Sequence, residues 1–133
     1  MNRNDEYLKS LTGREFKHFK GKMYKYLGIV HQYNEVTPYT SGSEIELYGN
    51  AIHTETDEML TIWTDVSNST SDRFLFTINK NNDNEEDLVL YQAEYGENLC
   101  YLRPIDMFLS EVDKTKYPHV KQRYRFELLE GEK

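Results

Sequence analysis

LVLYQAEYGENLCYLRPIDMF, residues 88–108, carries the strongest structural signal in this chain. Its first six residues alternate with the period of two that is typical of a β-strand. Gly96 supplies turn chemistry, and residues 99–102 predict a second short strand. Pro104 suits the first turn of a helix, because its fixed φ and missing amide proton cost nothing there. We therefore predict a hairpin followed by a short helix that reaches Phe108.

The rest of the chain is mostly strand-like, with turn-forming segments between the strands. A short helix is predicted near the N-terminus, where Asn4 can cap it and Gly13 can end it. Four strand-like runs predict two further β-hairpins, made by residues 23–36 with 44–54 and by residues 59–66 with 73–79. The acidic segment 79–87 predicts a mobile loop, residues 113–122 an irregular segment, and residues 123–129 a final strand.

The composition indicates one soluble domain. A chain of 133 residues fits a single domain, and no apolar run approaches the roughly 20 residues that span a bilayer. No signal-peptide pattern is visible. Cys100 is the single cysteine, so an internal disulfide is excluded, and its strand-like context predicts a packed, reduced thiol. We expect a cytoplasmic protein without a membrane partner.

Charge is distributed unevenly along the chain. Residues 1–25 carry seven Lys or Arg against three acids, a balance of +4. Residues 26–113 carry three against seventeen, a balance of −14, and residues 114–133 return to +3. The acidic middle would repel a polyanion, so extended nucleic-acid binding is not expected. The two ends would form a basic rim if they met in space, although solvated faces often segregate charge in the same way.

Lysines alternate with aromatic residues near the N-terminus. The lysines are Lys17, Lys20, Lys22 and Lys25, and the aromatic residues are Phe16, Phe19 and Tyr24. A basic and aromatic pattern of this kind can contact phosphates. A solvated strand face with its aromatic rings turned inward explains the same alternation, and we favour that interpretation.

Four short motifs stand at intervals along the chain: His18-Phe19-Lys20-Gly21, His53-Thr54-Glu55-Thr56, Tyr91 with Tyr95-Gly96, and Arg103-Pro104 with Met107-Phe108. This set resembles a small bacterial and phage family, domain of unknown function family sixteen-fifty-three. Tyr101 is a departure, since many members carry tryptophan there. The resemblance implies a small SH3-like barrel and almost nothing about function.

Compared with compact members of that family, this chain has extra residues after Ile29 and between Glu58 and Leu88. Both additions have hairpin character. We therefore predict a mostly β single domain over residues 1–133, a small SH3-like antiparallel barrel extended by two β-hairpins, with short helices. The barrel core is predicted at about 14–30, 51–58 and 88–129, and the hairpin additions at about 30–50 and 59–87.

His53 and Glu55 are two residues apart, so a strand would place both on one face. Two ligands of this kind fit a metal patch, but no third is visible nearby. The P-C-x-x-C partner that zinc deaminases need is also missing from the sequence. We therefore predict no metal and interpret the two residues as a hydrogen-bonded structural or ligand-contacting pair.

Arg103 is the residue best suited to bind a ligand. Pro104 keeps its backbone extended, and a guanidinium can bind a carboxylate or phosphate with two hydrogen bonds, or stack on a ring. A pocket is therefore predicted from Arg103, Tyr91, Tyr95, Tyr101, His53 and Glu55. The alternative is an internal salt bridge, for example from Arg103 to Glu55, that fixes the barrel.

No catalytic motif is visible. The sequence has no G-x-S-x-G, no P-loop and no glycine-rich dinucleotide turn, and hydrophobic neighbours of Cys100 favour packing over reactivity. We predict no cofactor and no catalytic residue.

Three classes of function stay open. The first is a non-catalytic binding module that takes a small anionic, nucleotide-like ligand; sequestering a host signalling nucleotide would be one use in a phage. The second is an acidic inhibitor or adaptor that mimics nucleic acid and binds a basic protein partner through residues 44–46 and 83–87. The third is an undetected enzyme. Exposed edge strands could also pair between copies, so a homo-oligomer is a further alternative.

Overall fold

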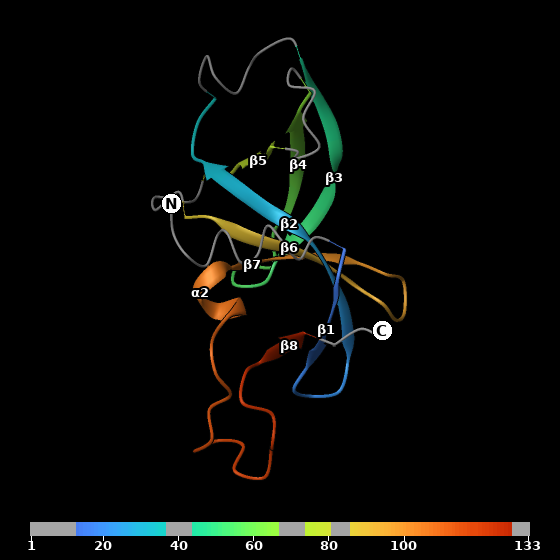
Figure 1. Ribbon diagram of the computed structural model, residues 1–133. Coiled ribbons are helices and arrows are strands. Elements are labelled where there is room, and N and C mark those ends of the chain that lie inside the picture. The colour runs from blue at the N-terminus through green and yellow to red at the C-terminus, as the bar shows by residue number, and fades with distance from the viewer. Residues whose placement is uncertain (1–12, 37–43, 67–73, 81–85, 129–133) are drawn as a thin grey trace.

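The computed structural model describes residues 13–36, 44–66, 74–80 and 86–128, and the fold below concerns these residues alone. They are 54% strand and 4% helix, which confirms the mostly β prediction. The strands are β1 (Glu15–His18), β2 (Met23–Tyr33), β3 (Ile45–His53), β4 (Met59–Asp65), β5 (Phe74–Ile78), β6 (Leu88–Ala93), β7 (Cys100–Pro104) and β8 (Phe126–Leu128). Helix α2 (Ile105–Phe108) follows β7 directly (Figure 1).

Six of the strands close into a small SH3-like barrel, as predicted. Their order is β5-β4-β3-β7-β6-β2, and an additional pairing of β2 with β5 joins the two ends. Two of the pairings, β2–β5 and β3–β7, are parallel, whereas the other barrel pairings are antiparallel, so the barrel is mostly antiparallel with two parallel seams. Both seams join strands that are distant in the chain, and such strands need not run in opposite directions as hairpin partners must.

β2 is the longest strand, with 11 residues, and it belongs to two parts of the structure. Its first residues pair with β1 on one side and β6 on the other, and its last residues pair with β5 and the start of β6. The register with β6 shifts between Tyr26 and Gly28. A bulge at this place bends a strand and increases its twist, which lets β2 leave the β1 side and close the barrel.

The predicted hairpins have different outcomes. The hairpin of residues 88–104 forms as β6 and β7, and the pairing of β4 with β5 confirms the one predicted from residues 59–66 and 73–79. The hairpin predicted from residues 23–36 and 44–54 is wrong, because β3 pairs with β4 and β7. The alternating patterns predicted the strands correctly, but a local pattern does not specify which strand is the partner.

A short turn joins β3 to its hairpin partner β4. Residues 54–58 connect β3 to β4, and Asp57 there has a φ of 64°. Aspartate tolerates this left-handed conformation better than most residues, so the turn closes without glycine.

The sheet has a hydrophobic core on each side. The barrel interior is filled by Val30, Ala51, Leu60, Ile62, Leu75, Leu88, Leu90 and Leu102. The outer core, as we call the second cluster, consists of Phe16, Tyr26, Val89, Tyr91, Phe108 and Phe126. Both faces of β6 are therefore buried, and this explains why five of its six residues are buried although their types alternate.

The outer core is covered by elements from the two ends of the described chain. β1 pairs with both β2 and β8, and β1, β8 and α2 lie on the same side of β6 and β7 (Figure 1). Phe108 of α2 is buried in this core. Residues 109–125 are largely irregular, as predicted for residues 113–122, and β8 is shorter than the predicted 123–129 strand. The predicted helix of residues 4–12 lies outside the described residues.

The predicted acidic loop is partly described. Residues 81–85 lie outside the described part, but both flanks are fixed to β2. Asn79 donates a hydrogen bond to Gln32 (2.7 Å), and Asp87 contacts His31 (2.9 Å). The division of the chain into a family core and two added hairpins stays a prediction.

Phe108 tests the outer core. Its ring stacks on Phe126 with centroids 4.4 Å apart, and it is 1% exposed. Replacing Phe108 with Ala is expected to lower the free energy of unfolding by about 3–5 kcal/mol, because the cavity is closed on all sides. Urea denaturation measures this, with Phe108→Leu as a milder control. A loss below about 1 kcal/mol would mean that the outer core is not a folded unit.

Candidate functional site

The hairpin of β6 and β7 brings three of the predicted residues together. Tyr91 lies opposite Tyr101, and Val89 lies opposite Arg103. Side chains two residues apart on a strand share a face, so Tyr101 and Arg103 lie on the side of the sheet that bears the outer core. The centroids of the Tyr91 and Tyr101 rings are 5.8 Å apart.

Arg103 is held in place without a carboxylate. Its Nε donates a hydrogen bond to the hydroxyl of Tyr91 at 3.0 Å, and its guanidinium carbon lies 5.6 Å from the centroid of the Phe126 ring. Within the described residues, no acidic side chain forms an ion pair with Arg103. The alternative of a salt bridge to Glu55 is therefore wrong, and the two terminal nitrogens of the guanidinium have no protein partner among those residues.

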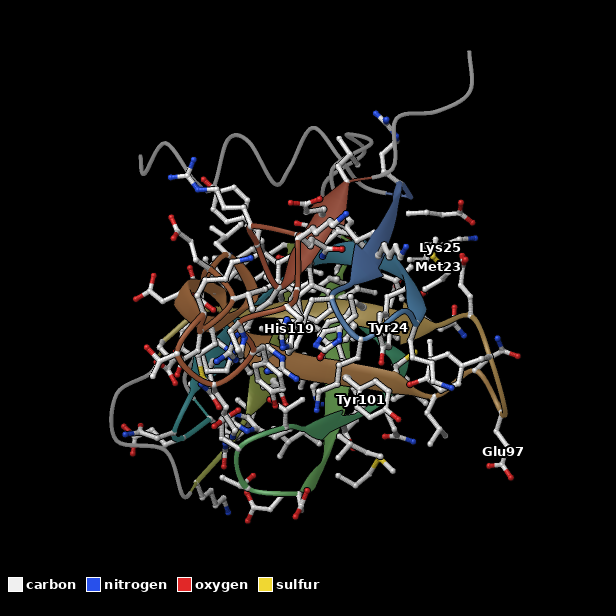
Figure 2. The ribbon with its side chains drawn as sticks, turned by 90° about the horizontal axis from the view of Figure 1, so that it is seen from below. Met23, Tyr24, Lys25, Glu97, Tyr101 and His119 are labelled. Atoms are coloured by element: carbon white, nitrogen blue, oxygen red, sulfur yellow. The ribbon has the colours of Figure 1, made fainter. Side chains whose placement is uncertain are left out.

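Tyr95 joins the group through a residue that the sequence-based site did not include. The hydroxyls of Tyr24 and Tyr95 are 2.7 Å apart, and the Tyr24 ring lies edge-on to Tyr91 at 5.2 Å. Figure 2 shows Tyr24 of β2 near Tyr101 of β7. Met23 and Lys25, the neighbours of Tyr24 in β2, lie farther from Tyr101 in this view. The sequence feature that could have indicated Tyr24 as a site residue is the alternation of lysines with aromatic residues near the N-terminus.

His53 and Glu55 do not belong to this group. His53 is in register with Leu102, whose side chain fills the barrel interior, and so it lies on the opposite side of the sheet from Arg103. Its Nδ1 accepts a hydrogen bond from the Glu55 backbone amide at 3.2 Å, which fixes the turn after β3. This arrangement fits the prediction of a hydrogen-bonded structural pair better than the prediction that His53 and Glu55 share a pocket with Arg103.

The phenols of Tyr24 and Tyr91 are neutral hydrogen-bonding groups. Burial and the hydrogen bond with Tyr95 raise the pKa of Tyr24 above its ordinary value. Burial also raises the pKa of Tyr91, although the nearby Arg103 guanidinium opposes the shift. Tyr91 accepts its hydrogen bond from Arg103, so its own O–H proton is left to donate.

His18 lies beside the tyrosine group, on β1. Its ring is 4.9 Å from Phe126 and 6.3 Å from Tyr24, with the rings close to perpendicular in both pairs. Burial, followed by the positive charges of Arg103, Lys20 and Arg125, lowers the pKa of His18 from its ordinary 6.5 to about 4. The imidazole is therefore neutral at pH 7 in a markedly positive environment.

The two basic ends of the chain do meet here. The side-chain amide of Gln122 donates a hydrogen bond to the Lys17 carbonyl (2.9 Å), and the Phe19 amide donates one to the Arg125 carbonyl (2.9 Å). Phe19 also packs edge-on against Tyr117 at 4.9 Å. The two basic segments of the chain therefore contact each other, through Lys17 and Phe19 on one side and residues 117–125 on the other.

Cys100 is half-buried against the barrel interior, and burial raises the pKa of its thiol. Among the described residues, no three His, Cys, Asp or Glu side chains gather closely enough to hold a metal ion. The described part of the chain also has no helix long and apolar enough to cross a membrane.

The fold and this surface define the class of protein: a small SH3-like β-barrel with a basic and aromatic group on the outside of one wall. Residues 72–128 match the family model described as "Protein of unknown function (DUF1653)", which confirms the resemblance for the two motifs in this range, Tyr91 with Tyr95-Gly96 and Arg103-Pro104 with Met107-Phe108. The motifs at residues 18–21 and 53–56 lie outside the matched range. The matched range contains Tyr91, Tyr95, Tyr101 and Arg103. No curated protein and no solved structure matches the chain.

His18 gives a direct test of the electrostatics. Its ¹H NMR titration is expected to have a midpoint near pH 4, below the ordinary 6.5, and Arg103→Gln should move it upward because Arg103 is the leading charged contributor. The unfolded chain takes up this proton nearer pH 6.5, so His18 makes the fold less stable as the pH falls from 6.5 to 4.

The exposed Lys80 is not among the charges that act on His18, and Lys80→Gln serves as the control. A wild-type midpoint near 6.5 would show that the imidazole is solvated and far from the cations.

Proposed function

We propose that this protein is a non-catalytic binding module for a small anionic, nucleotide-like ligand, which binds at Arg103 and the surrounding tyrosines. The observation that carries the proposal is a guanidinium that is fixed by Tyr91 and Phe126 and lacks an acidic partner among the described residues. A partly buried cation without a counter-charge is costly, and an anionic ligand would supply that charge.

The aromatic side chains support the nucleotide-like part of the proposal. Tyr101 is partly exposed and Tyr95 is 37% exposed, so both present ring surface on which a planar group can stack. Lys22 lies 4.6 Å from the centre of the Tyr95 ring and adds a positive charge at that edge. A base on the tyrosines and a phosphate near the cations would use both chemistries.

Binding without turnover is the use that fits these groups best. The phenols stay protonated at neutral pH, and the raised pKa of Cys100 makes its thiol a poor nucleophile. Sequestration of a signalling nucleotide, by a phage or a bacterium, is the biological role we propose for such a module.

A nucleotide panel tests the proposal by isothermal titration calorimetry, with nucleoside monophosphates, nucleoside triphosphates and cyclic dinucleotides as probes. Arg103→Ala is expected to weaken binding by about tenfold to a hundredfold, the usual value of a hydrogen bond to a charged group. Tyr91→Phe, which keeps the buried ring and removes only the hydroxyl, should weaken binding less. Tyr91→Ala would disturb the outer core as well as the site, because Tyr91 is 2% exposed and packs in that core.

Arg123→Ala is the matched control, since Arg123 is exposed, pairs with Glu111 and stacks on Tyr124, which is not one of the proposed site tyrosines. Equal losses for Arg103→Ala and Arg123→Ala would contradict the proposed site. Turnover of any probe would favour the third alternative, an enzyme.

A second candidate function is supported by β3. Among the described residues, Ile45 to Asn50 pair with β4 on one edge only, and Leu47 on this segment is 63% exposed. Glu44 and Glu46 are also exposed. An open strand edge with acidic side chains is suited to an extended, basic segment of a protein partner. The other predicted acidic segment, residues 83–87, lies mostly outside the described part.

Charge reversal separates the two candidates. A Glu44→Lys/Glu46→Lys double variant is expected to lose a basic protein partner in affinity capture from a lysate of the source organism, because like charges then oppose each other. The same partner should be retained by Arg103→Ala, and nucleotide binding should be unchanged in the double variant. Retention of every captured basic protein by the double variant would argue against this second function.

A further inference from the structure

His18 and Arg103 meet at the ring of Phe126. The register of β1 with β8 places His18 opposite Phe126, and the two rings are 4.9 Å apart. Arg103 of β7 places its guanidinium carbon 5.6 Å from the centroid of the same ring. Three strands that are far apart in the sequence therefore bring an imidazole and a guanidinium to one aromatic support.

Two more cations, Lys20 and Arg125, lie near enough to His18 for their charges to lower its pKa. Lys20 follows His18 in the β1–β2 turn, and its ammonium lies 5.6 Å from the centre of the Tyr117 ring. Arg125 is the neighbour of Phe126, and its backbone carbonyl accepts a hydrogen bond from Phe19. The described residues include no acidic ion-pair partner for Lys20, Arg103 or Arg125.

A local hydrogen bond determines which nitrogen of the neutral His18 ring carries the proton. The Lys20 backbone amide donates to Nδ1 at 3.2 Å, so the neutral ring carries its proton on Nε2. Nε2–H has no protein acceptor among the described residues. The ring thus offers a hydrogen-bond donor, without a charge of its own, beside three cations.

We infer that His18, Lys20, Arg103 and Arg125 form a phosphate subsite that binds the dianionic phosphate group of the ligand, with the neutral imidazole donating from Nε2. This inference rests on the proposed function and deepens it, since it assigns the phosphate to one end of the site and leaves the tyrosines for the planar group. Three cations and one neutral donor match a dianion with several oxygens better than a single carboxylate.

The low pKa of His18 agrees with this arrangement. A histidine of ordinary pKa would gain positive charge below pH 6.5 and would repel the neighbouring cations. Because burial and the charges of Arg103, Lys20 and Arg125 hold the pKa of His18 near 4, the imidazole stays neutral from pH 5.5 to 7.5, and so does the nearby phenol of Tyr24.

The decisive experiment compares ligands with and without a phosphate. Calorimetry uses the tightest-binding nucleoside monophosphate of the panel, the corresponding nucleoside, and inorganic phosphate. His18→Phe keeps the ring that packs on Phe126, and Arg125→Gln keeps the backbone carbonyl that Phe19 uses. Both variants are expected to weaken the binding of the monophosphate and of inorganic phosphate at least fivefold and to leave the affinity for the nucleoside unchanged. Arg123→Gln should leave the affinity for all three ligands unchanged.

The pH profile adds an independent measurement. Binding of the monophosphate should tighten from pH 5.5 to 7.5, as the ligand loses its second proton near pH 6. Sulfate, which stays dianionic over this range, should bind with a flat profile. Thermal unfolding of His18→Phe and Arg125→Gln verifies that both variants are folded.

The outcomes separate the two levels of the proposal. Loss of binding in Arg103→Ala alone, with His18→Phe and Arg125→Gln unchanged, overturns the phosphate subsite and preserves the proposed function. Equal weakening of nucleoside and monophosphate by His18→Phe also overturns the subsite. If the wild-type protein binds no nucleotide and no inorganic phosphate, both the subsite and the proposed function are wrong.

Discussion

The pairing of β2 along both of its edges is the constraint on which the structure depends. A strand of 11 residues is longer than one side of a small barrel needs, so its N-terminal half extends beyond the barrel and pairs with β1. The register shift near Gly28 lets the C-terminal half turn and close the barrel against β5. One strand therefore creates both the barrel interior and the outer core.

The candidate site follows from the second of these cores. Tyr91 and Phe126 are buried in the outer core, and they support Arg103 and His18 at its border. Charged and polar groups held by buried rings lose little conformational freedom when a ligand binds. The same rings exclude water from one side of the guanidinium, which strengthens its attraction for an anion.

The sequence allowed most of the secondary structure to be predicted, and less of the site. Alternation within residues 88–93 identified β6, and the Arg103-Pro104 step identified the start of α2 correctly. Tyr91, Tyr101 and Arg103 could be grouped because a hairpin makes them neighbours. His53 was grouped with them wrongly, since its placement depends on the parallel seam of β3 with β7, for which no local pattern exists.

By itself, the sequence determined the β-strands, the turns and helix α2, because alternation, glycine, proline and charge act over a few residues. Only the tertiary structure decided that the two basic ends meet, that β2 pairs with β5 instead of β3, and that Tyr24 and His18 join Arg103. These contacts join residues up to 105 positions apart. Which distant residues come into contact depends on burying both faces of one sheet at once, and this is a property of the whole chain.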